Sequence, residues 1–144
     1  MSSVAIRVEV VAWALAQQDI CSIRRIVFVE EQGVPEELDL DGLDPECLHV
    51  LAWNDHGRPI ATARMEEDGK IGRMAVLKPW RGRGVGRALL EALLSEAAAR
   101  RLSRVHLAAQ TQAIGFYEKH GFQATGDIFL DAGILHRSMI LDLF

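Results

Sequence analysis

The chain has 144 residues, a formal net charge of −4 and 25% charged residues, which are ordinary values for one soluble globular domain. It has no apolar run close to the ~20 residues that a membrane-spanning helix needs, and its first residues lack the pattern of a secretory signal. Cys21 and Cys47 are its only cysteines, which is typical of a reducing compartment. We therefore expect a single cytoplasmic domain over residues 1–144, without membrane contact, and the negative charge argues against a nucleic-acid partner.

Acidic residues are concentrated in one stretch, residues 30–46, which contains no lysine or arginine. The acids of this acidic stretch are Glu30, Glu31, Glu36, Glu37, Asp39, Asp41, Asp44 and Glu46. Glycines and prolines interrupt it, which predicts an irregular loop or a broken short helix. Such a run of charge is either a solvated loop or a surface that attracts cations.

The first part of the chain predicts a strand followed by a helix. Apolar residues alternate with small or charged ones from Val4 to Val10, as in a half-buried strand. Asp19 is the predicted N-cap of the helix. The apolar residues that share one face of this helix are Ile20, Ile23, Ile26 and Val27. We expect the helix to end near residues 31–33.

The middle of the chain predicts three antiparallel strands and then a long helix. The strands cover residues 47–53, 60–65 and 71–77, and a turn-rich segment joins the first two into a hairpin. Apolar residues then repeat at helical intervals from Val85. Arg100 and Arg101 close this helix, as the helix dipole favours.

The last part predicts a short strand, a short helix and two more strands. Residues 105–109 form an apolar, bounded run, and the preceding helical crossover should make this strand parallel to residues 71–77. Thr111 is the predicted N-cap of a helix over residues 112–120, and Gly121 suits its C′ position. The final strands are predicted at residues 122–130 and 135–141, on either side of a turn.

A glycine loop, residues 81–87, lies between the 71–77 strand and the long helix, and its glycines alternate with arginines. Glycines let backbone N–H groups approach a ligand closely, and a helix that begins there directs the positive end of its dipole to the same place. Arg81, Arg83 and Arg87 add full charges. The loop therefore predicts a site for a phosphate-bearing ligand.

Two common phosphate-binding motifs do not fit this loop. A dinucleotide-binding motif would have a third glycine where Arg87 stands and an acidic residue after the next strand, where Gln110 lies. A P-loop would end in Gly-Lys followed by Ser or Thr, which is missing. The remaining pattern is Arg-x-x-Gly-x-Gly, formed by Arg81, Gly84 and Gly86 at the start of a helix.

This pattern resembles the pyrophosphate loop of the GNAT superfamily of acyl-CoA-dependent N-acetyltransferases. Downstream, residues 107–110 and 116–122 are similar to the strand and the tyrosine-bearing helix of that family. Residues 27–35 and 131–136, together with the aspartates of the acidic stretch and His49, are similar to its ElaA-like branch. With the predicted elements, the resemblance implies an α/β fold whose central sheet is mixed, mostly antiparallel and flanked by helices, with a strand splay that holds acyl-CoA.

The resemblance implies acetyl-CoA as the acetyl donor, with its pyrophosphate on the glycine-loop amides and its pantetheine arm along the edge of the 71–77 strand. The residues implied to contact it are Met74, Ala75, Val76, Arg81, Gly82, Arg83, Gly84, Val85, Gly86, Arg87, Gln110, Phe116 and Tyr117. An amide N–H near Val76 would polarise the thioester carbonyl. No metal is expected, because the histidines are scattered along the chain.

In this family a neutral amine attacks the thioester directly, so the resemblance implies that Tyr117 is the general acid for the departing thiolate. Many members carry a glutamate base on the strand before the loop, but residues 71–76 contain no acid. Base candidates elsewhere in the chain are Glu30, Glu31, His49, His106 and His136, with His136 and Glu31 kept as the main ones.

The acidic stretch gives a hypothesis about the acceptor, because acids on the acceptor side would attract a cationic amine and oppose the anionic donor. The residues predicted to bind a small cationic molecule are Glu30, Glu36, Glu37 and Asp39. The leading function is acetyl transfer from acetyl-CoA to a primary amine of such a molecule. The alternatives are a noncatalytic acyl-CoA-binding regulatory module and acetylation of a protein lysine or N-terminus. The resemblance is also consistent with a homodimer.

Overall fold

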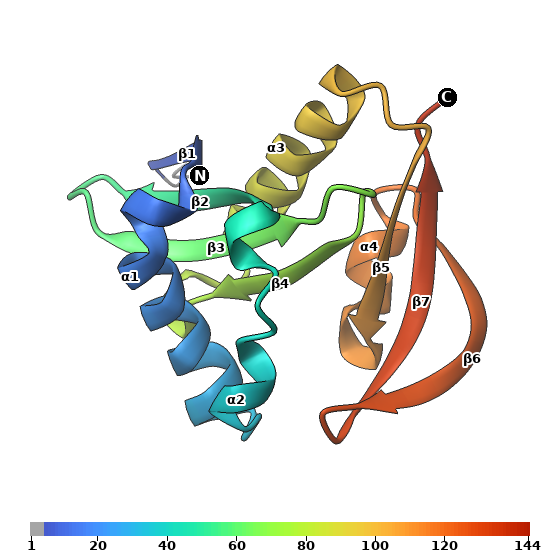
Figure 1. Ribbon diagram of the computed structural model, residues 1–144, viewed down its shortest axis with the longest axis horizontal. Coiled ribbons are helices and arrows are strands. Elements are labelled where there is room, and N and C mark those ends of the chain that lie inside the picture. The colour runs from blue at the N-terminus through green and yellow to red at the C-terminus, as the bar shows by residue number, and fades with distance from the viewer. Residues whose placement is uncertain (1–4) are drawn as a thin grey trace.

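The computed structural model describes residues 5–144, so Val4, the predicted start of the first strand, lies outside them. Two antiparallel sheets form the protein (Figure 1). The first has the order β1-β2-β3-β4, with β1 Ile6–Val11, β2 Leu48–Asn54, β3 Pro59–Met65 and β4 Ile71–Val76. The second has the order β5-β7-β6, with β5 Arg104–Gln110, β6 Gln123–Asp131 and β7 Ile134–Asp142. This mixed α/β arrangement, with helices on the sheets, confirms the predicted fold class.

The two sheets meet at one end of β4 and β5 and then separate (Figure 1). A single parallel bridge pairs Lys70 with His106, and the His106 N–H donates to the Gly69 carbonyl over 3.1 Å. A Cβ at Gly69 would lie 2.8 Å from the Arg104 carbonyl oxygen, so only glycine permits this approach. The parallel contact predicted between these strands is therefore confined to the bridge, and beyond it lies the splay between β4 and β5.

The first helix, α1 (Trp13–Arg24), begins directly after β1 and continues as the π-helical segment η1 (Arg25–Glu31). Ala12 is its N-cap and its carbonyl accepts the first helical hydrogen bonds, so the predicted start at Asp19 is wrong. The apolar face of the helix already begins at Ala16, because Ala16, Ile20, Ile23 and Val27 pack on Leu51 and Ala75. The predicted end near residue 31 is confirmed.

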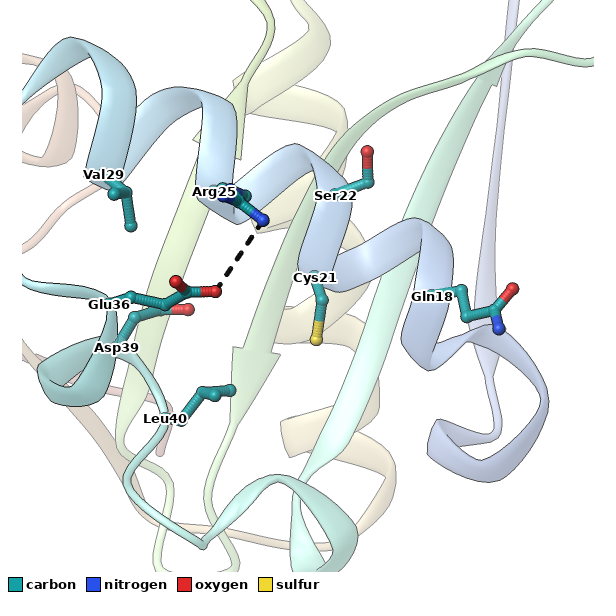
Figure 2. Close-up of a pocket in the computed structure, with 8 residues that line it drawn as sticks. All are labelled: Gln18, Cys21, Ser22, Arg25, Val29, Glu36, Asp39 and Leu40. Atoms are coloured by element: carbon teal, nitrogen blue, oxygen red, sulfur yellow. Dashed lines mark ion pairs between the residues drawn. The ribbon is translucent and has the colours of Figure 1, made fainter.

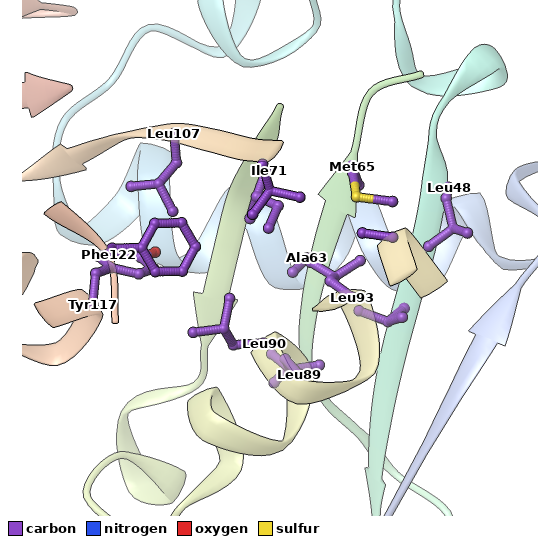
Figure 3. Close-up of a cluster of buried hydrophobic side chains, with 14 of the residues drawn as sticks. Leu48, Ala63, Met65, Ile71, Leu89, Leu90, Leu93, Leu107, Tyr117 and Phe122 are labelled. Carbon is purple, nitrogen blue, oxygen red and sulfur yellow. The ribbon is translucent and has the colours of Figure 1, made fainter. Parts of the chain in front are cut away.

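The longest helix, α3 (Val85–Ala99), covers the opposite face of the first sheet. Its buried residues Leu89, Leu90 and Leu93 pack with Ala63 and Met65 of β3 in the main core (Figure 3). Burial of this face, rather than helix propensity alone, holds α3 against the sheet. Within residues 5–144, no helix is long and apolar enough to cross a membrane.

The segment after β5 is a 3-10 turn, η4 (Thr111–Ala113), followed by the short helix α4 (Ile114–Glu118). Thr111 lies inside the first turn and no side chain caps either start, so its predicted role as N-cap is wrong. Gly121 has a φ of +92° and the Phe122 N–H donates to the Tyr117 carbonyl over 3.2 Å. This is the helix-ending geometry expected of a glycine at C′.

Short helical turns connect the remaining elements. The acidic stretch contains α2 (Glu36–Asp39) and η2 (Asp44–Glu46), as expected of a broken short helix. A third 3-10 turn, η3 (Lys78–Trp80), lies between β4 and the glycine loop. Figure 1 shows α1 and α2 on the same side of the first sheet. The acidic stretch therefore lies over the sheet face that α1 covers.

Candidate functional site

The outer edge of β4 is available for pairing next to the glycine loop. β4 is the last strand of its sheet, and its only described link to β5 is the bridge at Lys70. The Leu77 N–H points toward β3, where it donates to the Ile60 carbonyl over 3.0 Å. Since successive residues of an antiparallel strand point their amides to opposite sides, the Val76 N–H points toward the splay. An acyl carbonyl or an amide-bearing chain could pair with this edge.

A β-bulge in β4 shapes the edge before it reaches Val76. Thr62 and Arg64 of β3 pair with Ala75 and Gly72, so one residue of β3 lies opposite two residues of β4, Arg73 and Met74. Arg73 has a φ of +50°, a conformation that costs a non-glycine residue on the order of 1–3 kcal/mol. Such strain persists only where surrounding contacts hold it.

The glycine loop is built to receive an anion. Gly82 and Gly84 have φ values of +73° and +82°, and no protein atom lies within 4 Å of the place where a Cβ would stand on either. Gly84 is the N-cap of α3, and no side chain bonds to the amides of its first turn. Because the first helical hydrogen bond runs from Ala88 to Gly84, the three preceding amides are free to bind phosphate oxygens.

The three loop arginines differ in their surroundings. Arg81 turns back toward β4, where its Nε donates to the Val76 carbonyl over 2.9 Å and its Nη2 lies 2.8 Å from a Glu31 carboxylate oxygen. Arg83 lies over the Trp80 ring, with 5.3 Å from its Cζ to the ring centroid. Arg87 pairs with Glu91 on the same helix. Arg83 and Arg87 thus flank the loop, whereas Arg81 joins it to β4 and Glu31.

Tyr117 of α4 reaches across the splay to β4. Its hydroxyl lies 3.9 Å from the Met74 sulfur, and its ring packs edge-on against Phe116 and Phe122. Figure 3 shows this ring beside Phe122, in the part of the core that Leu107 also lines. Burial raises the pKa of Tyr117 to about 12, so the phenol keeps its proton at neutral pH. The side chain is therefore a proton donor held at the edge of β4.

Polar side chains from three elements meet at the other side of the splay. Gln32, just after η1, and Gln110, the last residue of β5, exchange hydrogen bonds, of which the shorter is 2.9 Å. His136 of β7 lies directly opposite Gln110 in the strand register, so the two side chains share a face. The His136 Nδ1 lies 2.7 Å from the Ile134 carbonyl oxygen. A carbonyl can only accept, so Nδ1 carries the hydrogen and Nε2 presents a lone pair.

The other two histidine candidates lie elsewhere. His49 is buried against Trp13, and its Nε2 is 2.8 Å from the Asp44 carbonyl oxygen. His106 faces Asp68 at the closed end of the splay, about 13 Å along β5 from Gln110 at the usual strand rise. Of the histidine candidates, only His136 therefore lies level with Gln110. Glu31 is paired with Arg81 beside the glycine loop, and Glu30, the residue before it in η1, is exposed to solvent.

The aspartates of the acidic stretch are not free charges. Buried Arg24 of α1 lies 3.1 Å from an Asp39 oxygen and 2.8 Å from an Asp44 oxygen. Arg64 of β3 pairs with Asp41 and Asp44. The sequence suggested a solvated loop or a surface that attracts cations, but folding brings arginines from α1 and the sheet to these acids. Asp39 is therefore buried and paired instead of exposed to solvent.

The arginines favour the charged forms of Asp41 and Asp44. Hydrogen bonds from Arg64 hold the pKa of Asp41 below its usual range. Burial alone would raise the pKa of Asp44, but hydrogen bonds from Arg24 and Arg64 outweigh it and lower that pKa. Removing one member of such a buried set leaves an unpaired charge, at a typical cost of about 3–5 kcal/mol.

A shallow groove lies on the outer side of α1, away from the splay. Figure 2 shows Cys21 and Gln18 of α1 on one wall, Leu40 on the other, and an ion pair between Arg25 and Glu36 across it, at 4.0 Å. Its lining includes no residue of β4, β5 or the glycine loop. Burial raises the pKa of the Cys21 thiol, which does not favour a reactive cysteine.

Comparison with known proteins identifies the family. A family model described as an acetyltransferase (GNAT) domain matches residues 17–143. The chain belongs to the GNAT acetyltransferase family. It is 41% identical over 129 residues to the uncharacterized N-acetyltransferase YjcF of Bacillus subtilis, a match that covers 87% of this chain and 91% of that protein.

Solved structures of GNAT proteins share this fold. A putative N-acetyltransferase from Lactobacillus plantarum superposes with a TM-score of 0.88 at 28% identity, covering 97% of this chain and 99% of the other. Escherichia coli ElaA superposes with a TM-score of 0.83 at 27% identity, covering 94% and 98%. The resemblance to the GNAT superfamily and its ElaA-like branch is thus confirmed.

Sequence reasoning missed two features of this GNAT site. Gln32 was not distinguished from its neighbours, because nothing in a single sequence places it opposite Gln110. Arg73 received no role, although an arginine in a strand next to the glycine loop is a signal of buried charge pairing. Both depend on contacts between segments that lie far apart in the chain.

Proposed function

We propose that this GNAT protein transfers an acetyl group from acetyl-CoA to a primary amine. The observation that carries this proposal is the position of Tyr117, whose protonated hydroxyl lies beside Met74 at the open edge of β4. The glycine loop, whose geometry suits a phosphate, follows the same strand after η3. Groups that suit acetyl-CoA and a hydroxyl that can give a proton thus lie together at one end of β4.

Three groups of residues would hold the donor. The free amides of the glycine loop, from Gly82 to Arg87, suit a pyrophosphate, and Arg83 and Arg87 lie at its rim. The outer edge of β4 is paired with no other strand from Met74 to Val76 in the described residues, so the Val76 N–H could bond to a pantetheine arm. The Val76 carbonyl on this edge already accepts from Arg81 Nε. A Cβ at Gly86 would lie 3.6 Å from the Phe116 ring, so this helix start is closely packed. When bound, acetyl-CoA supplies the acetyl group as an activated thioester.

The chain would handle protons with residues on both sides of the splay. Tyr117 would give its proton to the departing thiolate, a role that its raised pKa permits because the phenol is protonated at neutral pH. The Nε2 lone pair of His136 would accept a proton from the attacking amine, directly or through water. Glu31 is the second candidate base, and its carboxylate is held by Arg81. The Val76 N–H would stabilise negative charge on the carbonyl oxygen.

We further propose that the acceptor is a small cationic amine. Glu30, Glu36 and Glu37 remain exposed in the structure, so they could attract it. Asp39 no longer supports this idea, because its carboxylate is buried and paired with Arg24 and Arg73. The charge preference therefore depends on the three glutamates.

The proposal is tested with Tyr117→Phe, which keeps the ring that packs on Phe116 and Phe122 and removes only the hydroxyl. We expect turnover to fall about 10²–10⁴-fold, the usual contribution of a general acid, with CoA affinity nearly unchanged. Thiol release from acetyl-CoA with a panel of polyamines, aminoglycosides, lysine derivatives and lysine-containing peptides measures turnover. Isothermal titration calorimetry with CoA measures affinity.

The same panel separates the alternatives. A noncatalytic module would bind CoA and release no thiol with any amine, and a protein acetyltransferase would act on the peptides alone. Turnover by Tyr117→Phe at the wild-type rate would remove Tyr117 from the mechanism. The thermal midpoint of unfolding is the control, and it should match that of the wild type because the aromatic packing is kept.

A further inference from the structure

Arg73 lies where the β4 bulge and the acidic stretch meet. Its guanidinium Nη2 lies 3.3 Å from the Leu38 carbonyl oxygen, 3.2 Å from the Asp39 carbonyl oxygen and 3.2 Å from an Asp41 carboxylate oxygen. Its Nε lies 3.3 Å from an Asp39 carboxylate oxygen. One side chain of β4 is therefore bound to residues 38, 39 and 41 at once.

The acceptors of Arg73 are themselves fixed. Arg24 of α1, which is completely buried, donates both to the Asp39 carboxylate and to its carbonyl, the latter over 2.9 Å. Arg64, on the neighbouring strand β3, holds the Asp41 carboxylate. Arg73 is thus anchored to a loop that α1 and β3 hold in place, rather than to a free surface charge.

Met74, the other residue of the bulge, lies next to the proposed general acid, Tyr117. Met74, the next residue, places its sulfur 3.9 Å from the Tyr117 hydroxyl and 3.9 Å from the position of a Cβ at Gly86. A change in the bulge would therefore move the β4 edge relative to both Tyr117 and the start of α3. Val76, whose amide points toward the splay, lies two residues further along the same edge.

The backbone at Arg73 is in an unfavourable conformation. Its φ of +50° is a conformation that glycine adopts readily and arginine does not. The neighbouring residue, Gly72, has open space where a Cβ would stand, so crowding does not force this backbone conformation. The bonds of the guanidinium to residues 38, 39 and 41 offset the unfavourable backbone, so the loop and the bulge hold each other.

We propose that Arg73 is a positioning residue, whose guanidinium holds the β4 bulge so that Met74 and the Val76 amide stand correctly opposite Tyr117. Its effect on turnover rests on the proposed acetyl transfer. Its effect on the geometry around Tyr117 does not, and can be measured without an acceptor substrate. The acidic stretch then acts on the reaction through β4, independently of any contact with the acceptor.

The experiment uses the fact that Tyr117 is the only tyrosine of the chain. Protein labelled with 13C at the tyrosine ζ carbon gives one NMR signal, which reports the surroundings of this hydroxyl. Amide hydrogen exchange at Ala75 reports the pairing of β4 with β3. Both are compared in the wild type, Arg73→Gln and Arg58→Gln, where Arg58 is an exposed arginine of the turn between β2 and β3 and provides a matched loss of charge.

We expect Arg73→Gln to shift the Tyr117 signal and to speed exchange at Ala75, whose amide points toward β3, while Arg58→Gln changes neither. With an amine that the wild type acetylates, kcat should fall by roughly tenfold to a hundredfold, because small displacements of reacting groups have effects of that size. The Kd for CoA should change less than kcat, because the glycine-loop amides proposed to bind the pyrophosphate stay in place and only the pantetheine contacts at the β4 edge are altered. This split between kcat and Kd separates positioning from a general loss of folded protein.

A Tyr117 signal and an exchange pattern identical to those of the wild type would overturn the proposal. If Arg73→Gln does not fold, Arg73→Gly replaces it, because glycine tolerates this backbone conformation and lacks the guanidinium. The same shift of the Tyr117 signal is expected, and a signal and exchange pattern like those of the wild type would again overturn the proposal. If the wild type acetylates no amine, the proposed function fails, but the NMR and exchange results still decide whether Arg73 positions the site.

Discussion

At the scale of single residues, one backbone contact decides what His136 can do. In the neutral imidazole, Nδ1 carries the hydrogen that the Ile134 carbonyl accepts, so Nε2 is the accepting nitrogen; the side chain shares a face with Gln110. The nearby Phe129 ring stacks on the imidazole, with 5.9 Å between ring centroids, and restricts its rotation. Orientation and tautomer are both set before any substrate binds, as proton transfer requires.

The prediction for His136 concerns the pH dependence of turnover. If its Nε2 accepts the proton of the amine, His136→Gln should lower kcat/KM by about 10²–10⁴-fold near neutral pH and remove the fall in rate of the wild type on the acidic side. The measurement is a profile of kcat/KM against pH. His106→Gln is the matched control, because His106 faces Asp68 at the closed end of the splay. A variant that keeps the acidic limb would place the base elsewhere, with Glu31 as the next candidate.

At the scale of elements, the site depends on how β4 leads into α3. β4 ends at Val76, the chain turns through η3, and Gly84 in a left-handed conformation redirects it into the helix. The first turn of α3 then points its amides toward the splay side of β4. A strand edge and a helix N-terminus, each with unpaired backbone groups, are thus brought together by a short connection.

The prediction for this connection uses two matched glycines. Gly84 and Gly57 both have positive φ, +82° and +76°, and open space where a side-chain carbon would stand. Alanine should destabilise the protein by a similar 1–2 kcal/mol, on the order of the usual left-handed penalty, at each site. Only Gly84→Ala should weaken CoA binding, because only it lies in the glycine loop. Chemical unfolding measures the loss of stability, and calorimetry with CoA measures the affinity. Equal CoA affinities of Gly84→Ala and Gly57→Ala would contradict the proposal that the glycine loop binds CoA.

At the scale of the whole molecule, buried charge joins the acidic stretch to both α1 and the first sheet. Arg24, Arg64 and Arg73 come from three elements and converge on the aspartates of this stretch. His49 belongs to the same region, since its Nε2 contacts the Asp44 carbonyl and its ring stacks on Trp13. The loop is therefore part of the folded framework: Asp39 and Asp44 are buried in it, whereas its glutamates are exposed to solvent.

Stability should depend on pH through His49. Burial lowers the pKa of His49 below its ordinary value of 6.5, so the unfolded chain takes up a proton at a higher pH than the folded protein. Unfolded molecules then bind more protons, and stability is lost as pH falls below about 6.5, by up to about 1.4 kcal/mol per pH unit. The lowered pKa values of Asp41 and Asp44 act only below about pH 4, where unfolded carboxylates protonate.

The test compares His49→Gln with the wild type. Glutamine can still donate a hydrogen bond to the Asp44 carbonyl but does not titrate, so its unfolding free energy should decline less between pH 6.5 and pH 5. His56→Gln is the control, because the His56 side chain is 87% exposed. Urea unfolding at several pH values gives the free energies, and parallel curves for His49→Gln and the wild type would show that His49 does not carry this dependence.

The sequence alone determined the elements and located the glycine loop and Tyr117, on which the proposed donor site rests, because these follow from local patterns. The strand and helix periodicities, the glycine loop with Arg81, Gly84 and Gly86, and the downstream Tyr117 lie within short segments, where residue spacing dictates backbone geometry. The errors at Asp19 and Thr111 concern helix starts, where neighbouring strands, not capping side chains, set the boundary.

Only the tertiary structure decided what the charged residues do. It buried Asp39 against Arg24 and Arg73, turned Arg81 toward Glu31, placed His49 in the core and brought Gln32 to Gln110. Spacing cannot predict these pairs, because a long charged side chain takes whichever partner the folded chain brings close. Contacts between distant segments therefore decide which partner each charged side chain has, whereas the backbone of the glycine loop follows from the order of residues along the chain.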